Sequence, residues 1–451
     1  MGDRVRWHAR WVVPVATPPI ADGTVVTEGD RIAWVGPRAQ APAGGRDDDL
    51  GDAILAPGLV NAHTHLDLTM MRGFLEDLDF FGWVRTLTQA KREALGADDF
   101  RDAALLGVAE GLARGITSFG DTADNDAAFE ALRALGARGI AFREVFGPDP
   151  EHCDASMRGL REAVEAMRAR ETPLVRVGVS PHAPYSVSDA LFRAVGAYAA
   201  EARLPVAVHV AESAAEDDLV VRGTGPFAGF LAGRGIGVAP RASGPVALLE
   251  AAGLLRAETL LIHCVRASGD DVARIADAGC GVAHCPASNA KLGHGVAPLR
   301  EILAAGARVG LGSDSMASNN EMDILGEARL AVLQQRARLG QPDAVPARAA
   351  VRLATLGGAE ALRIDHEVGS LVPGKQADLV AFAADAHGGP VHDPCAALVF
   401  APGRVRASRV VVAGVERVRD GVVHGLDPAV AGRVRGTAAR LAQWRRARPP
   451  V

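Results

Sequence analysis

The sequence predicts a (β/α)8 barrel with a small β-sandwich built from both ends of the chain. Three observations support this fold class. Turn-rich β segments stand at each end, strands and helices alternate between them, and polar residues follow nearly every strand of the middle section. The expected boundaries are 1–56 and 368–427 for the two parts of the sandwich, 57–367 for the barrel, and 428–451 for a terminal helix and tail.

The end segments have the composition of strands joined by tight turns. Residues 5–55 contain Val-, Ile- and Trp-rich stretches separated by turn residues at 20–23 and 28–31, which is a hairpin signal. Pro57-Gly58 ends this section. After residue 368 the pattern returns: residues 369–380 read as a turn feeding a buried strand, and 409–414 with 421–423 read as a closing hairpin.

The middle section alternates apolar strands with Ala- and Leu-rich helices. The helical stretches include residues 98–114, 127–135, 155–170 and 189–202. The eight candidate strands end at residues 63–65, 118–121, 142–146, 179–182, 208–212, 261–264, 282–285 and 311–314. A doubly wound open sheet is the alternative. The polar and titratable residues at these strand ends favour a barrel, because a barrel gathers its active site there.

Composition narrows the class of protein. With 451 residues, 48% of them hydrophobic, and a net charge of −5, the chain is expected to be a globular enzyme with no basic surface for nucleic acid. No apolar run approaches the roughly 18 residues of a membrane helix. The charged N-terminus lacks a signal peptide, and the five cysteines are scattered without a Cys-x-x-Cys pair, which fits reduced thiols. A cytoplasmic location without a membrane partner is expected.

His63 and His65 are the first indication of a metal site. Side chains alternate along a strand, so both imidazoles lie on one side and can reach one cation. A single His-x-His is more often an ordinary pair on a strand. The other strand ends add His209, Glu212, His263 and Asp314, and together with His63 and His65 they favour a metal site.

Three imidazoles and one carboxylate suit Zn²⁺ or Fe²⁺ with a position left for water. Such a metal lowers the pKa of water from 15.7 to roughly 7. Glu212 could then move the proton, provided that burial raises its pKa towards neutrality. His263 could orient the nucleophile or polarise the substrate.

The chain resembles the amidohydrolase superfamily, in the branch of mononuclear nucleobase and nucleoside deaminases and chlorohydrolases. The resemblance covers essentially the whole chain. Its motifs are residues 57–65, 180–185, 209–212, 263–265, 284–293 and 312–315, with residues 374–380 matching the family's C-terminal sandwich.

The resemblance implies one divalent metal, Zn or Fe, held by His63, His65, His209 and Asp314. It also implies that Glu212 shuttles protons, that His263 contacts the nucleophilic water, and that His182 contacts the substrate. Asp314 would double as a base. Asn289 and Ser315, within the matching motifs, are further candidate substrate contacts, and a homodimer would be ordinary for this family.

The scarcity of lysine in this chain favours a mononuclear site over a binuclear one. Binuclear members of the superfamily bridge two metals with a carbamylated lysine at the end of strand 4. Strand 4 here ends in His182, and Lys91, Lys291 and Lys375 are all distant in sequence. A dihydroorotase- or hydantoinase-like enzyme is therefore not expected.

The segment around Trp83 helps to distinguish between possible substrates. Adenosylhomocysteine and methylthioadenosine deaminases have a Pro-x-Glu element after a tryptophan, and residues 81–91 lack it. The segment is instead similar to aminodeoxyfutalosine deaminases of menaquinone synthesis, as is the stretch 142–148, although that group usually has a glutamate where Asp67 stands. Trp83 could stack on a purine or belong to the core. Arg143 and Glu144 could clamp a carboxylate or sugar hydroxyls, or form a structural ion pair.

The leading hypothesis is thus a metal-dependent deaminase of a purine nucleoside-like small molecule, with aminodeoxyfutalosine as the best single substrate. The alternatives are an adenosine, methylthioadenosine or adenosylhomocysteine deaminase, and a hydrolase releasing chloride or an alkylamine from a triazine-like ring. A catalytically silent scaffold is the remaining alternative, and the complete ligand set argues against it.

Overall fold

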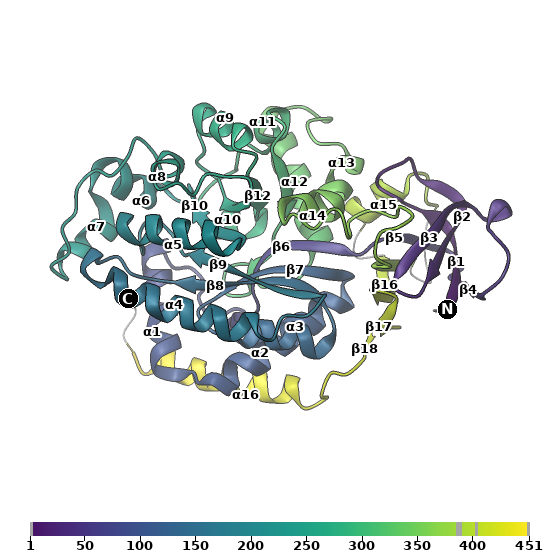
Figure 1. Ribbon diagram of the computed structural model, residues 1–451, viewed down its shortest axis with the longest axis horizontal. Helices are drawn as coiled ribbons and strands as arrows, with labels where there is room; N and C mark the ends of the chain where they lie inside the picture. Colours follow the sequence, from purple (N-terminus) through teal and green to yellow (C-terminus); the bar gives the residue numbers. More distant parts are fainter. Residues whose placement is uncertain (1–2, 385–389, 402–404, 449–451) are drawn as a thin grey trace.

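A curled parallel sheet wrapped by helices forms the larger part of the molecule (Figure 1). The computed structural model describes residues 3–384, 390–401 and 405–448. Neighbouring strands of this sheet follow one another in sequence, as expected for repeated β-α units. The strands are β6 (Leu59–His65), β7 (Ile116–Ala123), β8 (Arg138–Val145), β9 (Val175–Pro181), β10 (Val206–Val210), β11 (Thr259–His263), β12 (Gly281–His284), β13 (Arg308–Leu311) and β14 (Asp314–Ser315). All eight predicted strands are therefore confirmed.

The eighth strand is split, and its two halves close the barrel. β13 pairs with β12, whereas β14 pairs with β6, so the last strand joins the seventh to the first. Gly312 lies at the break. A Cβ there would meet the Cys285 sulfur and the His63 Cβ at 2.9 Å each, so only glycine lets the backbone pass this close to β6.

The helices lie outside the strands and bury one face against them. The predicted helices are confirmed to within two residues at their ends. The helices are α1 (Phe80–Ala94), α2 (Ala97–Ala113), α3 (Ala127–Leu135), α4 (Cys153–Arg168), α5 (Asp189–Ala202), α6 (Ala214–Asp217), α7 (Gly225–Ala232), α8 (Pro245–Ala251), α9 (Gly269–Asp277), α10 (Pro286–Lys291), α11 (Leu299–Ala304), α12 (Ile324–Leu339), α13 (Ala347–Arg352), α14 (Gly358–Ala361), α15 (Pro394–Phe400) and α16 (Val430–Arg446). Shorter 3-10 and π turns are η1 (Arg38–Gln40), η2 (Leu66–Met71), η3 (Pro150–His152), η4 (Asp218–Arg222) and η5 (Leu353–Gly357).

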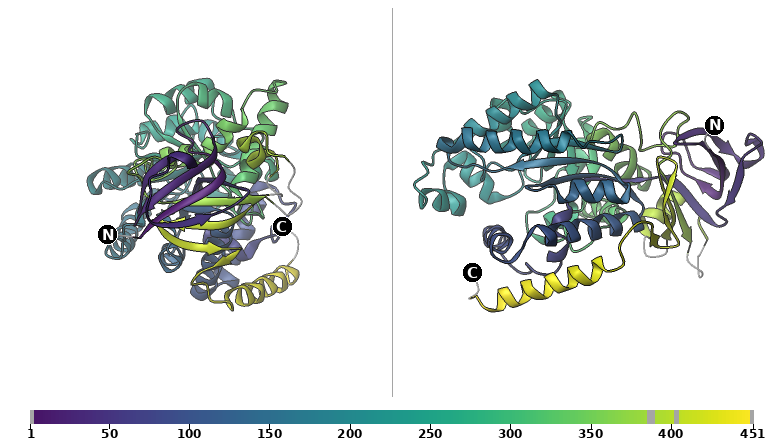
Figure 2. Two further views of the ribbon diagram at one scale, coloured as in Figure 1. Left: turned by 90° about the vertical axis from the view of Figure 1, so that its right-hand side faces the viewer. Right: turned by 60° about the horizontal axis from the view of Figure 1, so that its bottom comes forward.

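A second, mostly antiparallel sheet contains both ends of the chain, as predicted (Figure 2, left). The junction between the ends is the antiparallel pair β5–β15, in which Leu379 lies opposite Pro57. The sheet encloses a small core of its own, to which β1, β2, β3, β5, β15 and β16 all contribute. Its strands are β1 (Arg4–Val12), β2 (Ile20–Glu28), β3 (Arg31–Pro37), β4 (Arg46–Asp49), β5 (Ala53–Pro57), β15 (Leu379–Ala384), β16 (Val405–Val412), β17 (Val415–Arg419) and β18 (Val422–Val423).

The C-terminal helix α16 returns from this sheet and lies along α2 and α1 (Figure 2, right). Leu441 is fully buried in that contact. Arg433 forms an ion pair with Asp102 at 2.7 Å, and the Thr437 hydroxyl donates to Asp99 at 2.6 Å. The arginine-rich helix is thus half embedded in the barrel's outer layer rather than solvated all round. Within the described ranges, no helix combines the length and apolarity that crossing a bilayer requires.

Candidate metal centre and active site

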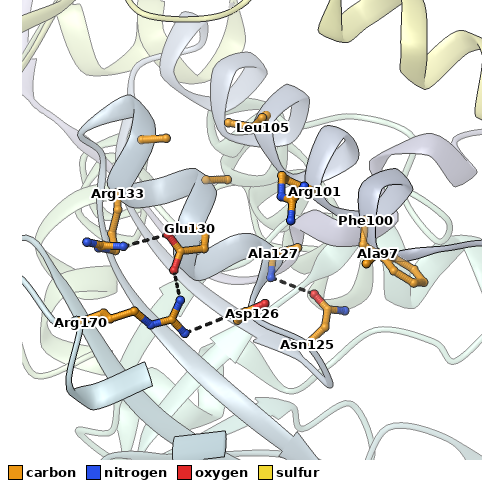
Figure 3. A pocket seen from close by; sticks show the side chains of 12 residues that line it. Ala97, Phe100, Arg101, Leu105, Asn125, Asp126, Ala127, Glu130, Arg133 and Arg170 are labelled. Atoms are coloured by element: carbon orange, nitrogen blue, oxygen red, sulfur yellow. Dashed lines mark hydrogen bonds and ion pairs between the residues drawn. The ribbon is translucent and has the colours of Figure 1, made fainter. Parts of the chain in front are cut away.

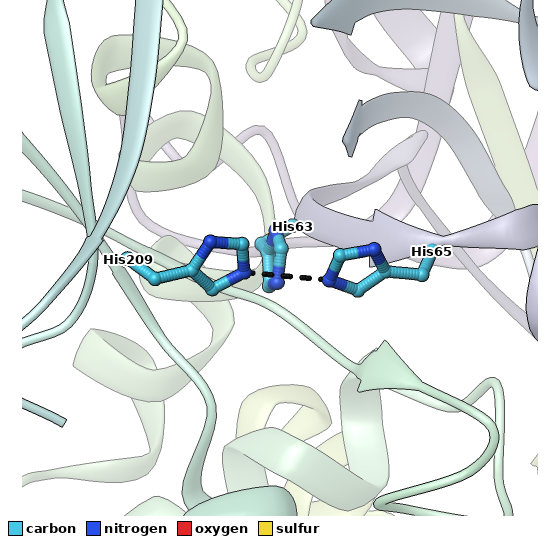
Figure 4. A group of neighbouring side chains, drawn as sticks. All are labelled: His63, His65 and His209. Atoms are coloured by element: carbon cyan, nitrogen blue, oxygen red, sulfur yellow. Dashed lines mark hydrogen bonds between the residues drawn. The ribbon is translucent and has the colours of Figure 1, made fainter. Parts of the chain in front are cut away.

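Four strand ends bring imidazole and carboxylate groups to one point inside the barrel mouth. Ring nitrogens of His63, His65 and His209 lie within 4.8 Å of one another, and ligand atoms of His63, His263 and Asp314 do the same. The Asp314 Oδ1 atom is 3.1 Å from His63 Nε2 and 3.6 Å from His65 Nε2. Figure 4 shows His65 and His209 facing each other with His63 between them. The strand-end cluster expected from the sequence is therefore assembled.

The protonation state of these rings is suited to binding a cation. The His209 Nδ1 atom lies 3.1 Å from the His182 carbonyl oxygen, to which it must donate, so its Nε2 carries a lone pair. That Nε2 is 3.3 Å from His65 Nε2. Burial lowers the pKa of His63 to about 4 and also lowers the pKa of His65 and His209, which keeps the rings neutral. Neutral nitrogens turned towards each other and towards a carboxylate are the donor set of a divalent transition metal.

Asp314 is held by a second set of contacts. Its Oδ2 atom accepts hydrogen bonds from the Ser288 hydroxyl at 2.5 Å and the Ser318 hydroxyl at 3.0 Å, which leaves Oδ1 facing the histidines. Burial would raise the pKa of Asp314, but its contact with His63 outweighs burial and holds the pKa well below its usual range. The carboxylate is therefore ionised and oriented.

The backbone is strained at three of these strand ends. Ala211, His263 and Asp314 have φ values of 50°, 75° and 58°, in the left-handed region that residues with a Cβ rarely adopt. Such conformations cluster at functional sites and persist when surrounding contacts impose them. Here they turn the chain sharply so that consecutive residues can point into the mouth.

Glu212 stands beside the cluster with two histidines. Its Oε1 atom is 3.5 Å from His263 Nε2 and 3.4 Å from His294 Nε2, and the residue is 4% exposed. Burial would raise the pKa of Glu212, but His263 and His294 together hold it below its usual value. The condition that burial raises this pKa towards neutrality is not met: the structure places compensating partners on both sides, so the carboxylate begins ionised.

Glu216 fixes the position of Glu212 from behind. Both of its carboxylate oxygens accept backbone N–H groups, from Ala211 at 2.9 Å and from Glu212 at 2.8 Å. Glu216 is fully buried, and this burial, opposed by the two N–H bonds, raises its pKa to about 8. The Glu216 side chain therefore stabilises the left-handed turn that carries Glu212.

A pocket of about 870 Å³ opens onto the cluster. Four of the expected substrate contacts line it, namely His182, Trp83, Ser315 and Glu144, together with His65, His209, Glu212, His263 and Asp314. Burial lowers the pKa of His182 to about 3, and its Nδ1 bonds the Ser186 hydroxyl at 2.7 Å, so its ring is neutral. Trp83 is 9% exposed and stacks on Phe80, so it belongs both to the pocket wall and to a satellite core.

Of the neighbours Arg143 and Glu144, only the glutamate lines the pocket. Side chains alternate along β8, so the two cannot both face inwards. The Glu144 Oε1 atom is buried without a hydrogen-bond partner, and burial raises the pKa of this carboxyl well above its usual value. Arg143 lies on the other side, within electrostatic range of Asp124 and Asp126. The expected pair of pocket contacts is thus reduced to Glu144.

Asn289 also differs from the expectation. It does not line the pocket; its side-chain oxygen accepts from His263 Nδ1 at 2.9 Å. This bond leaves His263 Nε2 turned towards Glu212, so Asn289 orients a site residue instead of touching the ligand space.

Two residues without an expected role reach the site. His294, in the loop after α10, contacts Glu212. Lys91, on α1, lines the pocket, with its Nζ atom 2.9 Å from Asp124 and 3.7 Å from Asp67. Lys91 is therefore near the site in space although distant in sequence. Burial would lower the pKa of Lys91, but the carboxylates of Asp67 and Asp124 outweigh burial and raise it, which keeps the amine charged.

A second cavity, of about 530 Å³, lies on the outer surface between α2 and α3 (Figure 3). Its charges satisfy one another: Arg170 bonds Glu130 at 2.5 Å and Asp126 at 3.1 Å, and Arg133 bonds Glu130 at 2.8 Å. No metal-binding cluster occurs there among the residues described. The chemistry is concentrated at the barrel mouth.

Barrel, strand-end histidines and buried carboxylates together define a metal-dependent hydrolase. The chain belongs to the amidohydrolase family, whose model matches residues 54–418. It is therefore a hydrolase of non-peptide carbon–nitrogen bonds that uses one divalent metal ion, as the sequence indicated.

Known proteins of this family resemble the chain over nearly its full length. It is 33% identical over 409 residues to a 5-methylthioadenosine/S-adenosylhomocysteine deaminase of Desulforudis audaxviator, covering 90% of this chain and 91% of that one. A Moorella thermoacetica protein of the same name is 33% identical over 424 residues, covering 92% and 94%.

Solved structures also resemble this chain over nearly its full length. An adenosine deaminase from Xanthomonas campestris with bound zinc has a TM-score of 0.85 at 28% identity, covering 98% of this chain and 99% of that one. The zinc complex of an atrazine chlorohydrolase from Arthrobacter aurescens has a TM-score of 0.82 at 26% identity, covering 97% and 99%.

Proposed function

We propose that this protein is a hydrolytic deaminase of an aminated purine nucleoside, in which His63, His65, His209 and Asp314 hold the metal ion. The observation that carries the proposal is the position of Glu212. An ionised carboxylate lines the pocket beside the histidine cluster, within 3.5 Å of two further imidazoles. Such a group can both accept and return a proton, which hydrolytic release of ammonia requires.

The bound metal supplies a Lewis acid that makes water nucleophilic near neutral pH. Glu212 accepts a proton from that water and delivers it to the ring nitrogen next to the carbon under attack. His263, oriented by Asn289, stabilises the negative charge that develops at the attacking oxygen. Asp314 accepts the second proton of the water, this proton passes to Glu212, and Glu212 then delivers it to the departing amine, so that both carboxylates end ionised. One water is consumed, and ammonia leaves in exchange for a carbonyl oxygen.

The pocket wall provides contacts for the rest of a nucleoside. Trp83 offers an aromatic face to the purine, and His182 and Ser315 offer polar groups at its edge. Glu144 lines the pocket with an unpartnered oxygen, which suits a hydrogen bond with a ribose hydroxyl. Burial without a partner is costly for that atom, and a substrate hydroxyl would remove the cost.

Two groups of purine nucleosides compete as the natural substrate. The resemblance of residues 81–91 and 142–148 favours aminodeoxyfutalosine, whereas the names of the relatives favour methylthioadenosine and adenosylhomocysteine. The likeness to an atrazine chlorohydrolase makes a triazine-type substrate the second candidate function.

Ammonia and chloride release should be measured on the zinc-loaded and the iron-loaded protein with aminodeoxyfutalosine, methylthioadenosine, adenosylhomocysteine, adenosine and atrazine. Ammonia from at least one nucleoside is expected, and chloride or alkylamine from atrazine alone would contradict the proposal. Glu212→Gln should lower kcat by roughly a thousandfold or more while the protein keeps its metal. Glu250→Gln, on the exposed face of α8, is the matched control and should retain full activity.

A further inference from the structure

His294 stands behind Glu212, in the loop that follows α10. The His294 side chain is 4% exposed, and its Nε2 atom is 3.4 Å from Glu212 Oε1. That Nε2 atom is buried and forms no regular hydrogen bond with any residue that the structure describes. His294 does not line the pocket, so it can act on a ligand there only through Glu212. The metal-binding cluster and the proton transfers proposed above make no use of this imidazole.

The backbone of the loop holds the His294 ring in place. Gly293 and Gly295, on either side of it, have φ values of 72° and 108°, a region that residues with a Cβ rarely adopt. The His294 N–H group donates to the carbonyl oxygen of Asn289 at 2.9 Å. Because the Asn289 side chain also accepts from His263 Nδ1, one residue of α10 fixes the positions of both histidines.

Aromatic side chains of the pocket wall pack against the His294 ring. The ring of Phe80, at the start of α1, lies 4.6 Å from it between centroids at an angle of 89°. Edge-to-face contact of this kind is a preferred arrangement of aromatic pairs. Phe80 in turn packs edge-on against Tyr185 at 5.9 Å and Phe227 at 6.0 Å. His294 is therefore enclosed between an aromatic cluster and a carboxylate, which leaves its ring little freedom to turn away.

The contact with Glu212 requires a hydrogen on His294 Nε2. An ionised carboxylate only accepts hydrogen bonds, so a bare ring nitrogen this close to Oε1 would be repelled. His263 Nε2 reaches the same oxygen at 3.5 Å, but His263 also donates to Asn289 and faces the attacking oxygen. His294 is thus the imidazole that can serve Glu212 alone. Catalytic hydrogen bonds are often long until substrate binds and then tighten, which fits a separation of 3.4 Å.

We propose that His294 is a positioning residue for Glu212: its Nε2–H group donates to Oε1 and holds the carboxylate so that Oε2 exchanges protons with water and substrate. The inference rests on the proposed function, because it takes Glu212 to be the proton shuttle. Glu216 fixes the backbone N–H of Glu212, and His294 fixes its side chain. Orientation matters here because a displacement of about 1 Å can cost about a hundredfold in rate.

Two substitutions of His294 separate positioning from packing. The side-chain nitrogen of glutamine is as many bonds from Cβ as Nε2 of histidine, so His294→Gln can keep the N–H donor whereas His294→Met cannot. Both variants lose the edge-to-face contact with Phe80, so both should lower the unfolding temperature to a similar extent. With the zinc-loaded enzyme and the best nucleoside of the panel, His294→Met should lower kcat by about ten- to a hundredfold with KM within about twofold. His294→Gln should keep kcat within about threefold of the parent.

His366→Met is the matched control. His366 also lies beside a glutamate, with its Nε2 atom 3.3 Å from Glu367 Oε1, but its side chain is 65% exposed and outside the pocket. This substitution should leave kcat and KM unchanged. Equal losses of kcat in His294→Met and His294→Gln would assign the effect to packing and overturn the inference, as would a kcat for His294→Met within about twofold of the parent.

Nuclear magnetic resonance of the zinc-loaded protein labelled with ¹⁵N-histidine tests the contact without turnover. Protonated and bare ring nitrogens have well-separated ¹⁵N shifts, and the His294 signals are those that disappear in His294→Gln. Nε2 of His294 should carry hydrogen, and Glu212→Gln should move its signal whereas Glu250→Gln, on the exposed face of α8, should not. A bare Nε2, or a signal that Glu212→Gln leaves in place, would refute the contact.

The same measurements distinguish failure of this inference from failure of the proposed function. If no nucleoside releases ammonia, but the His294 signal responds to Glu212→Gln and only His294→Met slows chloride release from atrazine, the deaminase assignment fails and the positioning role stands. If nucleosides release ammonia and His294→Met keeps kcat within about twofold, the deaminase stands and the positioning role fails. If neither nucleosides nor atrazine react and the signal does not respond, both inferences are wrong.

Discussion

Replacing Glu216 by glutamine tests whether catalysis depends on the turn that carries Glu212. The Glu216 side chain accepts the backbone N–H groups of Ala211 and Glu212 with its two oxygens, at 2.9 and 2.8 Å. Glutamine has one oxygen, so its amide N–H₂ must face one of these donors. A buried N–H group without an acceptor costs about 1–3 kcal/mol.

The effect on rate follows if this cost is relieved by displacing Glu212. Ala211 has a φ of 50°, so the turn is already strained and relaxes readily once a restraining bond is lost. A penalty of 1–3 kcal/mol on the geometry needed in the transition state corresponds to a fall in kcat of about 5- to 150-fold. KM should change little, because Glu216 does not line the pocket.

The assay is steady-state ammonia release on the best nucleoside of the panel, with metal content and thermal unfolding measured on the same samples. Asp378→Asn is the control. Asp378 is also a buried carboxylate that accepts a backbone N–H, that of Ala413 at 2.8 Å, but it lies at the junction with the end sheet. It should lower the unfolding temperature without lowering kcat of the folded protein. If Glu216→Gln lowers stability alone and keeps kcat within twofold, its role is structural and the reasoning fails.

Removal of the metal by a chelator should abolish activity and lower the unfolding temperature, and zinc should restore both; an ion present at a thousand times its Kd stabilises by about 4 kcal/mol. Full activity in a protein shown to contain no transition metal would contradict the assignment of the cluster. The free energy of unfolding should fall as pH drops from 6.5 towards 3, because burial lowers the pKa of His182 and His284 to about 3. In that window the unfolded chain binds protons that the folded chain rejects, and at pH 5 the loss is about 2 kcal/mol per histidine. Denaturant titrations of His284→Leu should show a shallower loss, and an unchanged pH slope would exclude the histidine as its source. Truncation after residue 427 removes α16, which packs on α1 and α2, so KM should rise several-fold as the α1 wall loosens, and an unchanged KM would show that α1 is held without it.

The fold and the gathering of the strand-end side chains were predictable because each rests on a strong local pattern. Apolar runs that stop at a histidine or carboxylate mark the strand ends, and a barrel has to bring those ends together. No knowledge of side-chain packing was needed to predict that the ends of these strands bring together His63, His65, His209 and Asp314. The pairing of the two chain ends was predictable because both carry turn-rich β segments.

The misjudged residues depend on direction or on distant packing. Arg143 and Glu144 are adjacent, and the alternation along a strand already required that only one face the pocket, so the signal was present. Lys91 and His294 enter from a helix and a loop whose path cannot be read from periodicity. The pKa of Glu212 is lowered by His263 and by His294, and both contacts depend on side-chain packing that the sequence pattern does not show.

The β5–β15 junction has a consequence for how the chain is made. β5 is complete at Pro57, but its antiparallel partner ends at Ala384, more than 300 residues later. At 5–20 residues per second, the ribosome needs roughly 15–65 s to supply that partner. During this interval one side of β5 presents unpaired N–H and C=O groups, which are a template for pairing with another nascent chain. The junction therefore makes synthesis, rather than the finished enzyme, the stage most exposed to aggregation.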